Sequence, residues 1–570
     1  MPKRVKARAM KHASCNTQHI RKNITLTKEQ LDAVNKISKN SKFNPPAGGQ
    51  NSKFLLYGPA SSGKTEVYIH AIKKLKEKNA NLQFLILLPE LTLTPQAIER
   101  YGAYFSPEET VILHSKISKG KFYSDWQDIK SGKAKIIIGS RMAVFAPFKN
   151  LGLIVIDEEQ DMSFKQWDMN PRYDARTVSE KLAEIHSCKI VFGSATPRIE
   201  SFHKARQEKY TLLELPQLVG IGSLHGDPIP TKIELVDMKK ERWIKNYSPI
   251  SKKLQSEIAY ALKNKLQTIL FINRQGLSSF SICTRCKTVL RCPKCERALI
   301  YDKEGVYKCV HCAYRSSVIP ECPKCKSLTF TNVGLGTQKI EREVASLFPG
   351  ARIARADNQT MKEPRAQENL YKIFKDGEID ILIGTQIISK GWDLPNVALI
   401  GIIDGDGMLS IPDYTTEERA FQNIIQVAGR TGRTGAKFPG LVLVQMFHPE
   451  SSFFKNISEK NLENFYDKEL KDRKALRLPP FGKLIKLIFQ DYSAKKAASA
   501  AEGIYKILES MDLQGIKISE AQDSFVSNIR GRHRRQLIIK ISDDIPEKLA
   551  KILKALPSGW IIDVDPISII

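Results

Sequence analysis

The sequence predicts an α/β protein with two parallel-sheet lobes, a double zinc-binding insertion in the second lobe and a C-terminal α+β domain. Three observations lead to this prediction. Short apolar runs alternate with helical segments, which is typical of buried parallel strands separated by helices. The alternation occurs twice, on either side of a stretch that accumulates Pro and Gly. Four C-x-x-C pairs interrupt the second series after its first apolar run.

The apolar runs predict the strands of both lobes. Those of the first lobe are expected at Lys53–Tyr57, Gln83–Leu88, Lys135–Ile138, Leu151–Ile156 and Lys189–Phe192. Those of the second are expected at Gln267–Ile272, Arg352–Ala354, Ile379–Ile383, Val397–Ile403 and Leu441–Phe447. The predicted domains are a basic disordered tail (1–23), lobe 1 (24–210), a connector (211–247), lobe 2 (248–282 and 326–450), the zinc-binding insertion (283–325) and a C-terminal domain (451–570).

Composition restricts the class of protein. The 89 Lys and Arg outnumber the 61 Asp and Glu, and a net charge of +28 favours polyanions, with nucleic acid as the leading partner. No apolar run is long enough to span a bilayer, so no membrane partner is expected. The first 23 residues hold seven Lys or Arg and no acid, but no apolar core of a secretory signal. We expect a cytoplasmic protein, with an organellar transit peptide as the alternative.

A phosphate-binding loop is the most specific motif of the first lobe. The pattern G-x-x-x-x-G-K-T follows an apolar strand and opens a helix, and there backbone N–H groups cradle phosphates. Lys64 is expected to reach the β and γ phosphates of ATP, and the Thr65 hydroxyl to ligate Mg²⁺. The predicted ATP-binding residues are Gly58, Pro59, Ala60, Ser61, Ser62, Gly63, Lys64 and Thr65.

An acidic motif ends the apolar run that begins at Leu151. Asp157 is expected to hold Mg²⁺, and Glu158 to position and deprotonate the attacking water. Gln160 follows two residues later and can form hydrogen bonds across the cleft without carrying charge.

Two further motifs predict coupling between the lobes. Gly193-Ser-Ala-Thr-Pro197 ends the next strand, where small hydroxyl residues can relay the state of the ATP site. In the second lobe, Gln426, Arg430 and Arg433 form a Q-x-x-x-R-x-x-R pattern, and arginine suits a developing phosphoryl charge. The segment from Gly384 to Asp393 is expected to sense nucleic acid and nucleotide together. Hydrolysis would then depend on closure of the two lobes, which converts ATP turnover into stepping along a strand.

Aromatic and basic residues alternate directly after the acidic motif. Such residues can stack on bases and grip phosphates, although core packing is the alternative for the aromatic members. The predicted DNA-binding residues are Phe164, Lys165, Trp167, Arg172 and Tyr173.

The eight clustered cysteines have the spacing of two tetrahedral zinc sites. Thirteen residues between the middle pairs favour a nested arrangement, with sequential pairing as the alternative. In the nested arrangement the outer pairs Cys283, Cys286, Cys322 and Cys325 share one Zn²⁺, and the inner pairs share the other. The inner ligands are Cys292, Cys295, Cys309 and Cys312.

With these residues in view, the chain resembles the PriA family of replication-restart DNA helicases, which belongs to helicase superfamily 2. The resemblance extends from about Leu26 to the last residue and includes the RecA-like lobes with their cysteine-rich insertion. Further matching stretches are Leu87–Gln96, Gly139–Phe148, Phe271–Arg274, Arg477–Phe481 and Arg532–Ile539.

The resemblance implies a 3′-to-5′ DNA helicase that acts at stalled or abandoned forks and D-loops and restarts replication by primosome assembly and loading of the replicative helicase. Implied partners are DNA single strands, single-stranded DNA-binding protein and primosome components, in the bacterial cytosol or nucleoid. The C-terminal domain is implied to bind DNA.

Departures from the family pattern leave an alternative open. Only about 25 residues precede the motor, where the family usually carries 3′-end-binding and winged-helix domains, so no strong preference for a leading-strand 3′ end is expected. Gln160 and Trp392 stand where the family usually has histidine. The alternatives are a DNA-binding primosome assembly scaffold with a weakened motor and an RNA-directed motor.

Overall fold

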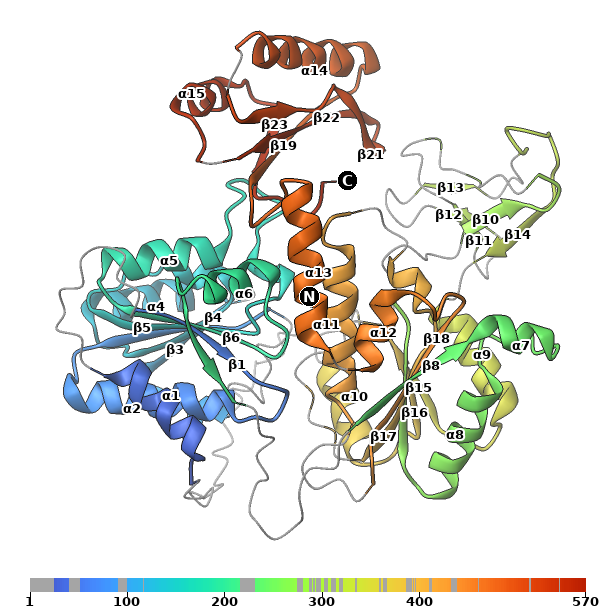
Figure 1. The fold of residues 1–570 in the computed structure, drawn as a ribbon, viewed down its shortest axis with the longest axis horizontal. Helices are drawn as coiled ribbons and strands as arrows, with labels where there is room; N and C mark the ends of the chain where they lie inside the picture. The colour runs from blue at the N-terminus through green and yellow to red at the C-terminus, as the bar shows by residue number, and fades with distance from the viewer. Residues whose placement is uncertain are drawn as a thin grey trace, which may run out of the picture.

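The structure is a computed structural model, and the two lobes, the insertion and the C-terminal domain are shown in Figure 1. The tail predicted over residues 1–23 lies outside the described residues. No helix in the described part of the chain is long and apolar enough to cross a membrane. The described residues are 25–39, 52–90, 100–115, 117–215, 231–273, 280–286, 290, 293, 299–301, 306–308, 314–316, 321–333, 336–357, 360–361, 366–385, 392, 394, 396–409, 413–431, 438–459, 461–511, 514–542 and 544–569.

Lobe 1 is built on a seven-stranded parallel sheet in the order β3-β4-β2-β5-β6-β1-β7. The central strands are buried on both faces, as their continuous apolar runs predict. The strands in chain order are β1 (Lys53–Tyr57), β2 (Gln83–Leu87), β3 (Thr110–Leu113), β4 (Ile136–Gly139), β5 (Leu151–Asp157), β6 (Lys189–Ser194) and β7 (Thr211–Glu214). The helices are α1 (Lys28–Ser38), α2 (Lys64–Lys78), α4 (Lys119–Ser131), α5 (Ala175–Ile185) and α6 (Ile199–Arg206).

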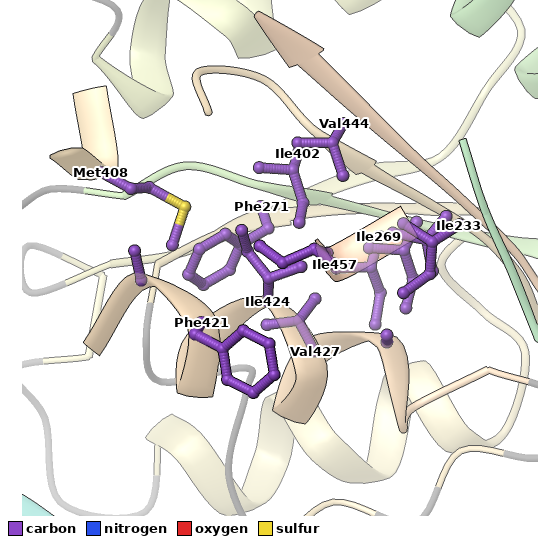
Figure 2. Packing of buried hydrophobic residues seen from close by; sticks show 14 of the residues in the cluster. Ile233, Ile269, Phe271, Ile402, Met408, Phe421, Ile424, Val427, Val444 and Ile457 are labelled. Carbon is purple, nitrogen blue, oxygen red and sulfur yellow. The ribbon is translucent and has the colours of Figure 1, made fainter. Parts of the chain in front are cut away.

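Lobe 2 is built on a six-stranded parallel sheet in the order β15-β16-β9-β17-β18-β8. The strands in chain order are β8 (Lys232–Asp237), β9 (Gln267–Phe271), β15 (Ile353–Ala356), β16 (Ile381–Gly384), β17 (Val397–Ile402) and β18 (Leu441–Met446). The helices are α7 (Met238–Trp243), α8 (Lys252–Lys263), α9 (Thr337–Leu347), α10 (Ala366–Lys375), α11 (Thr416–Ala428), α12 (Ser452–Ser458) and α13 (Leu462–Ala475). Phe421, Ile424 and Val427 of α11 pack toward the sheet (Figure 2).

The cysteine-rich insertion leaves lobe 2 after β9 and returns before α9. Its base is an antiparallel pair of β10 (Phe280–Cys283) and β14 (Phe330–Val333). The short strands β11 (Ile300–Tyr301), β12 (Tyr307–Lys308) and β13 (Arg315–Ser316) form a second small sheet. The predicted position of the insertion within the second lobe is therefore confirmed.

The C-terminal domain has an antiparallel sheet that carries α14 (Ala494–Glu509) and α15 (Glu547–Ala555) on one side (Figure 1). Leu508 of α14 and Leu549 of α15 pack in one apolar core with Leu487 and Leu537 of the sheet. The strands are β19 (Lys483–Asp491), β20 (Ile516–Ile518), β21 (Gln522–Ile529), β22 (Arg532–Ile541) and β23 (Trp560–Val564).

Two domain boundaries differ from the sequence prediction. The predicted connector, 211–247, contains β7, which pairs with β1, and β8, which pairs with β18. Helices α12 and α13, predicted in the C-terminal domain, pack in the apolar core of lobe 2. Edge strands and helices next to a polar stretch carry a weak periodicity signal. Strand pairing and packing therefore show which lobe these elements belong to, whereas the sequence pattern does not.

Helix α13 also contacts lobe 1, so it bridges the two lobes. The Tyr466 hydroxyl donates to Pro197 O at 2.6 Å, and the Tyr466 ring stacks on Phe202 of α6 at 4.2 Å. The buried Arg473 guanidinium pairs with Glu418 of α11 at 2.7 Å and with Glu469 at 3.2 Å. Three carboxylates surround this one arginine, since Glu200 of α6 lies 3.5 Å from it.

We predict that Glu469→Gln reduces the dependence of stability on pH. Burial raises the pKa of Glu469 to about 7, with further increases from Glu418 and Glu417 that Arg473 only partly opposes. A carboxyl with a raised pKa stabilises the folded state fully below its unfolded pKa, and this contribution is lost as the pH rises through the folded value. The difference in melting temperature between the variant and wild type should therefore be more favourable to the variant at pH 8 than at pH 5, by a few degrees. This corresponds to a change in the free energy of unfolding on the order of 1–3 kcal/mol.

Thermal unfolding at both pH values measures this difference. The control is Glu463→Gln, a substitution of an exposed carboxylate on the same helix. An equal shift of both variants between the two pH values would contradict the prediction.

Candidate functional site

The parallel register of lobe 1 brings three predicted motifs to one edge of the sheet. Strand β6 lies between β1 and β5, with Tyr57 opposite Ser194 and Asp157 opposite Gly193. The carboxyl ends of neighbouring parallel strands form the usual ligand-binding edge of an α/β sheet. The phosphate loop after β1, the acidic motif after β5 and Ser194 at the end of β6 therefore meet.

The phosphate loop has the backbone conformation that an anion site at a helix start requires. Ser61 and Gly63 have left-handed φ values of 66° and 80°, and α2 begins at Lys64. A Cβ on Gly58 would lie 2.8 Å from Leu215 O, so only glycine fits there. The buried Gln30 amide of α1 donates to Ser62 O at 2.9 Å, which ties α1 to the loop.

Lys64 lies folded across the loop. Its ammonium donates to Gly58 O at 2.8 Å and to Pro59 O at 3.0 Å. Burial lowers the pKa of Lys64, and the carboxylates of Glu158 and Asp157 oppose this change. A cation held by two carbonyls inside an anion cradle is suited to exchange these partners for phosphate oxygens.

Asp157 is held by a tyrosine that the sequence analysis did not select. The Tyr68 hydroxyl of α2 donates to Asp157 Oδ1 at 3.1 Å. A Cβ on Gly193 would lie 1.6 Å from this hydroxyl, so glycine leaves the space that Tyr68 occupies. Burial, followed by the charge of Glu158, raises the pKa of Asp157 to about 6 despite Lys64. A buried carboxylate next to a second one is stabilised by a cation, so Asp157 and the Thr65 hydroxyl fit the oxygen-ligand chemistry of Mg²⁺.

A chain of hydrogen bonds leads from the acidic motif to the end of β6. Glu158 has a left-handed φ of 52°, and its Oε2 accepts from the Gln160 amide at 2.6 Å. The Ser194 hydroxyl donates to Gln160 Oε1 at 2.5 Å and accepts from Thr196 N at 2.9 Å. Gln160 therefore links the predicted catalytic carboxylate to the loop that follows β6.

The second lobe meets this loop through α11. Gln422 donates to Thr196 O at 3.5 Å, and Ile199 N donates to Glu418 Oε1 at 3.0 Å. A Cβ on Gly429, at the end of α11, would lie 3.0 Å from Ala60 Cβ of the phosphate loop.

The predicted arginine motif is only partly described. Gln426 lies on the last turn of α11, and the Arg430 guanidinium donates to Trp392 O at 2.7 Å within lobe 2. Arg433 lies outside the described residues, as do Lys390, Gly391 and Asp393 of the segment after β16. The role predicted for Arg430 and Arg433 stays a prediction.

The aromatic and basic segment after β5 is anchored to the C-terminal domain. The buried Lys165 ammonium pairs with Asp563 of β23 at 2.9 Å, and Arg172 pairs with the same carboxylate at 3.4 Å. Phe164 is buried in the core of lobe 1, and the Tyr173 ring packs edge-on against Phe145.

Trp167 differs from the other members of this segment because it is 56% exposed. The Trp167 ring is therefore accessible for stacking on a base, whereas the side chains of Phe164 and Lys165 are buried in contacts within the protein. Their predicted DNA contacts stay predictions.

The structure brings the four outer cysteines together at the base of the insertion. The sulfur atoms of Cys283, Cys286, Cys322 and Cys325 all lie within 4.8 Å of one another. A tetrahedral Cys₄ zinc site, with Zn–S bonds of about 2.3 Å, separates its sulfur atoms by roughly 3.8 Å. The cluster therefore fits a metal ion, and its all-thiolate ligands favour Zn²⁺. The inner cysteines, Cys292, Cys295, Cys309 and Cys312, lie outside the described residues.

Three structural partners of the site were not found from the sequence. Gln30 carried only a capping signal, which the structure also contains as a capping box with Thr27. Tyr68 has the pattern of an ordinary core residue of α2. Asp563 lies almost 400 residues from Lys165, and no local pattern signals a pairing over that separation.

Comparison with known families defines the class of the protein. Residues 27–205 match the DEAD/DEAH box helicase family, and residues 315–435 match the helicase conserved C-terminal domain. The first match covers most of lobe 1, and the second covers the part of lobe 2 that follows β9 up to the end of α11. The chain therefore has the two-lobed architecture of a superfamily-2 helicase. Residues 474–567 match the primosomal protein N C-terminal domain.

Individual relatives define the family. The chain is 36% identical over 508 residues to replication restart protein PriA of Bacillus subtilis, covering 89% of this chain and 61% of that protein. It is 36% identical over 556 residues to PriA of Chlamydia trachomatis, covering 95% and 71%. For PriA of Rickettsia conorii the identity is 36% over 516 residues, covering 90% and 76%. The chain belongs to the PriA family of replication restart proteins. It spans about three fifths of the length of the Bacillus and Synechocystis relatives, 61% and 62%.

We predict that Cys286→Ser removes one bound metal ion per chain. The substitution takes one thiolate from the described four-sulfur cluster, and a structural metal contributes folding energy to the segment that it holds. Metal analysis of purified protein, together with proteolysis of the insertion, measures the effect. The control is Cys188→Ser, because Cys188 is buried in the core of lobe 1 and belongs to no cysteine pair. Equal metal content in both variants would exclude the site.

Proposed function

We propose that this chain is an ATP-dependent DNA helicase of replication restart that moves 3′ to 5′ on DNA. The observation that supports it most is the continuous contact from Glu158 through Gln160 and Ser194 to α11 and α13. A carboxylate placed to activate water is thereby linked to the second lobe. Membership of the PriA family supports replication restart as the setting.

The chain's own groups have defined tasks in this proposal. Bound Mg²⁺·ATP supplies the phosphoryl group that is hydrolysed. Backbone N–H groups at the start of α2 and the Lys64 ammonium hold phosphate oxygens. Thr65 and Asp157 offer oxygen ligands, with Asp157 oriented by the Tyr68 hydroxyl. Glu158 accepts the proton of the attacking water, and Gln160 holds the Glu158 carboxylate in place.

Lobe closure completes the site in this proposal. Gly429 already lies against Ala60, so residues after α11 approach the phosphates when the cleft narrows. Arg430 and Arg433 then stabilise the charge that develops on the transferred phosphoryl group. In each cycle of closing and opening, the two lobes move alternately along a DNA strand.

The proposed substrates are stalled or abandoned forks and D-loops. The proposed partners are single-stranded DNA-binding protein, primosome components and the replicative helicase. The nested cysteine arrangement supports two Zn²⁺ ions in the insertion, one in the described cluster and one in the inner cysteines. We propose a role for the C-terminal domain in DNA binding.

Unwinding of a model fork with purified chain and ATP tests the proposal, with Lys64→Ala as the variant. We expect ATP hydrolysis and unwinding to fall by about 10²–10³-fold in the variant, because one phosphate-binding cation is lost. DNA affinity without nucleotide should match wild type. Wild-type chain that binds forks but neither hydrolyses ATP nor unwinds would favour an assembly scaffold instead.

We predict that Ser194→Ala weakens the stimulation of ATP hydrolysis by DNA. The variant loses the hydroxyl that joins Gln160 to Thr196, at a cost of about 1–1.5 kcal/mol, or roughly tenfold in DNA-stimulated turnover. ATP affinity should be unchanged, since Ser194 contacts the loop through its carbonyl, which accepts from Gly58 N. Single-turnover ATP hydrolysis with and without DNA measures this effect.

The matched control for this variant is Ser179→Ala. Ser179 is also a buried serine of lobe 1, and its hydroxyl has no hydrogen-bond partner among the described residues. Equal DNA stimulation in the two variants would rule out the relay.

A further inference from the structure

An aromatic and basic surface surrounds helix α7, which lies on the side of lobe 2 away from lobe 1 (Figure 1). It comprises α7, the turn that follows α7 and the residue after β18. Trp243 is 80% exposed, Tyr247 73% and Ile244 63%. We define the lobe-2 patch as Lys240, Arg242, Trp243, Lys245, Tyr247 and Phe447. Large exposed apolar groups gathered in one place usually mark a binding surface.

The patch is a single surface because its two segments follow neighbouring strands, β8 and β18, at the same edge of the lobe-2 sheet. Asp237 at the end of β8 lies opposite Met446 at the end of β18. The segment 238–247 therefore begins next to Phe447. The Arg242 guanidinium lies 5.7 Å from the centre of the Tyr247 ring and 6.0 Å from that of Phe447.

The turn after α7 is held in one conformation by internal hydrogen bonds. Arg242 donates to Asn246 O at 2.8 Å, and Asn246 N donates to Glu241 O at 2.9 Å. Lys245 takes the left-handed φ of 58° that closes the turn. A surface ordered before binding loses less conformational entropy when a ligand arrives.

Residues 238–247 carry a net positive charge, and the acid among them, Glu241, is turned inward. Beside Phe447, Asp406 accepts from Phe447 N and Glu450 pairs with Lys239. Glu241 is buried and accepts from the Asn246 amide at 2.6 Å and from Lys252 N at 2.9 Å. Lys240 and Lys245 are exposed beside Trp243 and Tyr247. The surface therefore presents cations and aromatic faces together, which is the chemistry that binds single-stranded nucleic acid: rings stack on bases and ammonium groups contact phosphates.

The position of the patch agrees with this occupant. All strands of the lobe-2 sheet are parallel, so their carboxyl ends lie along one edge. The same edge carries Asn273 after β9 and Thr385 after β16, where the segment predicted to sense nucleic acid begins. Strand β18 is two strands from β9 in the sheet, roughly 10 Å at the usual strand spacing.

We propose that the lobe-2 patch binds single-stranded DNA, with Trp243 and Tyr247 stacking on bases and Lys240 and Lys245 contacting phosphates. The proposal rests on the DNA helicase function proposed above. It adds to the motor a stacking platform on the outer side of lobe 2.

Equilibrium binding of the full chain to a fluorescent single-stranded oligonucleotide at fixed salt tests the proposal. One stacked base contributes roughly 1–3 kcal/mol, so Trp243→Ala and Tyr247→Ala should each weaken binding about fivefold or more. The matched control is Tyr260→Ala. Tyr260 is a tyrosine of the same lobe with 62% exposure, near the end of α8 and therefore toward the opposite edge of the sheet. The control should bind as wild type does, and all three variants should keep the wild-type melting temperature.

A blunt duplex separates stacking from plain charge attraction. Paired bases offer no free face to an aromatic side chain, so duplex affinity should change less than single-strand affinity in both patch variants. Lys240→Gln with Lys245→Gln should reduce the salt dependence of single-strand binding by about 1.4 in log–log slope if both contact phosphates.

The outcomes separate this proposal from the function on which it rests. Wild-type chain without any DNA affinity overturns both. Patch variants that bind single strands within twofold of Tyr260→Ala overturn the patch alone, and would assign it to another occupant such as a protein. Equal losses for single strand and duplex would overturn the stacking role.

Discussion

One buried carboxylate, that of Glu418, determines how the two lobes meet. Its Oε1 accepts from Ile199 N of lobe 1 and its Oε2 accepts from Arg473 of α13. Removal of either partner of a buried ion pair leaves an uncompensated charge, which costs more than the intact pair contributes. The arrangement of α6, α11 and α13 is therefore restricted to geometries that keep both oxygens occupied. Since α11 ends at Gly429, against Ala60, the same constraint sets the width of the cleft beside the phosphate loop.

Polar groups in the proposed ATP site are arranged in a way that favours a charged ligand. Lys64 is bonded to two loop carbonyls, and Asp157 has a raised pKa because burial and Glu158 disfavour its charge. Phosphate oxygens and a divalent cation would relieve both conditions at once. The site thus stores unfavourable electrostatics that ligand binding removes. In the proposed mechanism, the hydrogen bonds through Gln160 make the carboxylate pair sensitive to the position of the second lobe.

Patterns within a short stretch of sequence predicted those elements of the fold that depend mainly on neighbouring residues. Continuous apolar runs predicted the central strands, and the phosphate-loop motif predicted the loop in which Gly58 leaves no room for a Cβ beside Leu215 O. The edge strands β3, β7 and β8 were missed, because a strand with one neighbour is partly exposed and loses the continuous apolar signal. Pairings such as Lys165 with Asp563 depend on packing of distant domains, and neither residue carries a sign of its partner in its own neighbourhood.

The junctions between the parts combine polar contacts with a few apolar ones, such as the stacking of Tyr466 on Phe202. The sheet of the C-terminal domain has its own core, distinct from those of the two lobes. Its contacts with the lobes include directional ones: Lys165 with Asp563, and the Tyr414 hydroxyl with Pro566 O at 2.9 Å. A large apolar interface would hold the lobes in one state, since its free energy grows with the area that any opening exposes. A few hydrogen bonds and ion pairs specify an arrangement and can be exchanged at modest cost. The polar contacts in the junctions are therefore compatible with the opening and closing of the lobes that is proposed above.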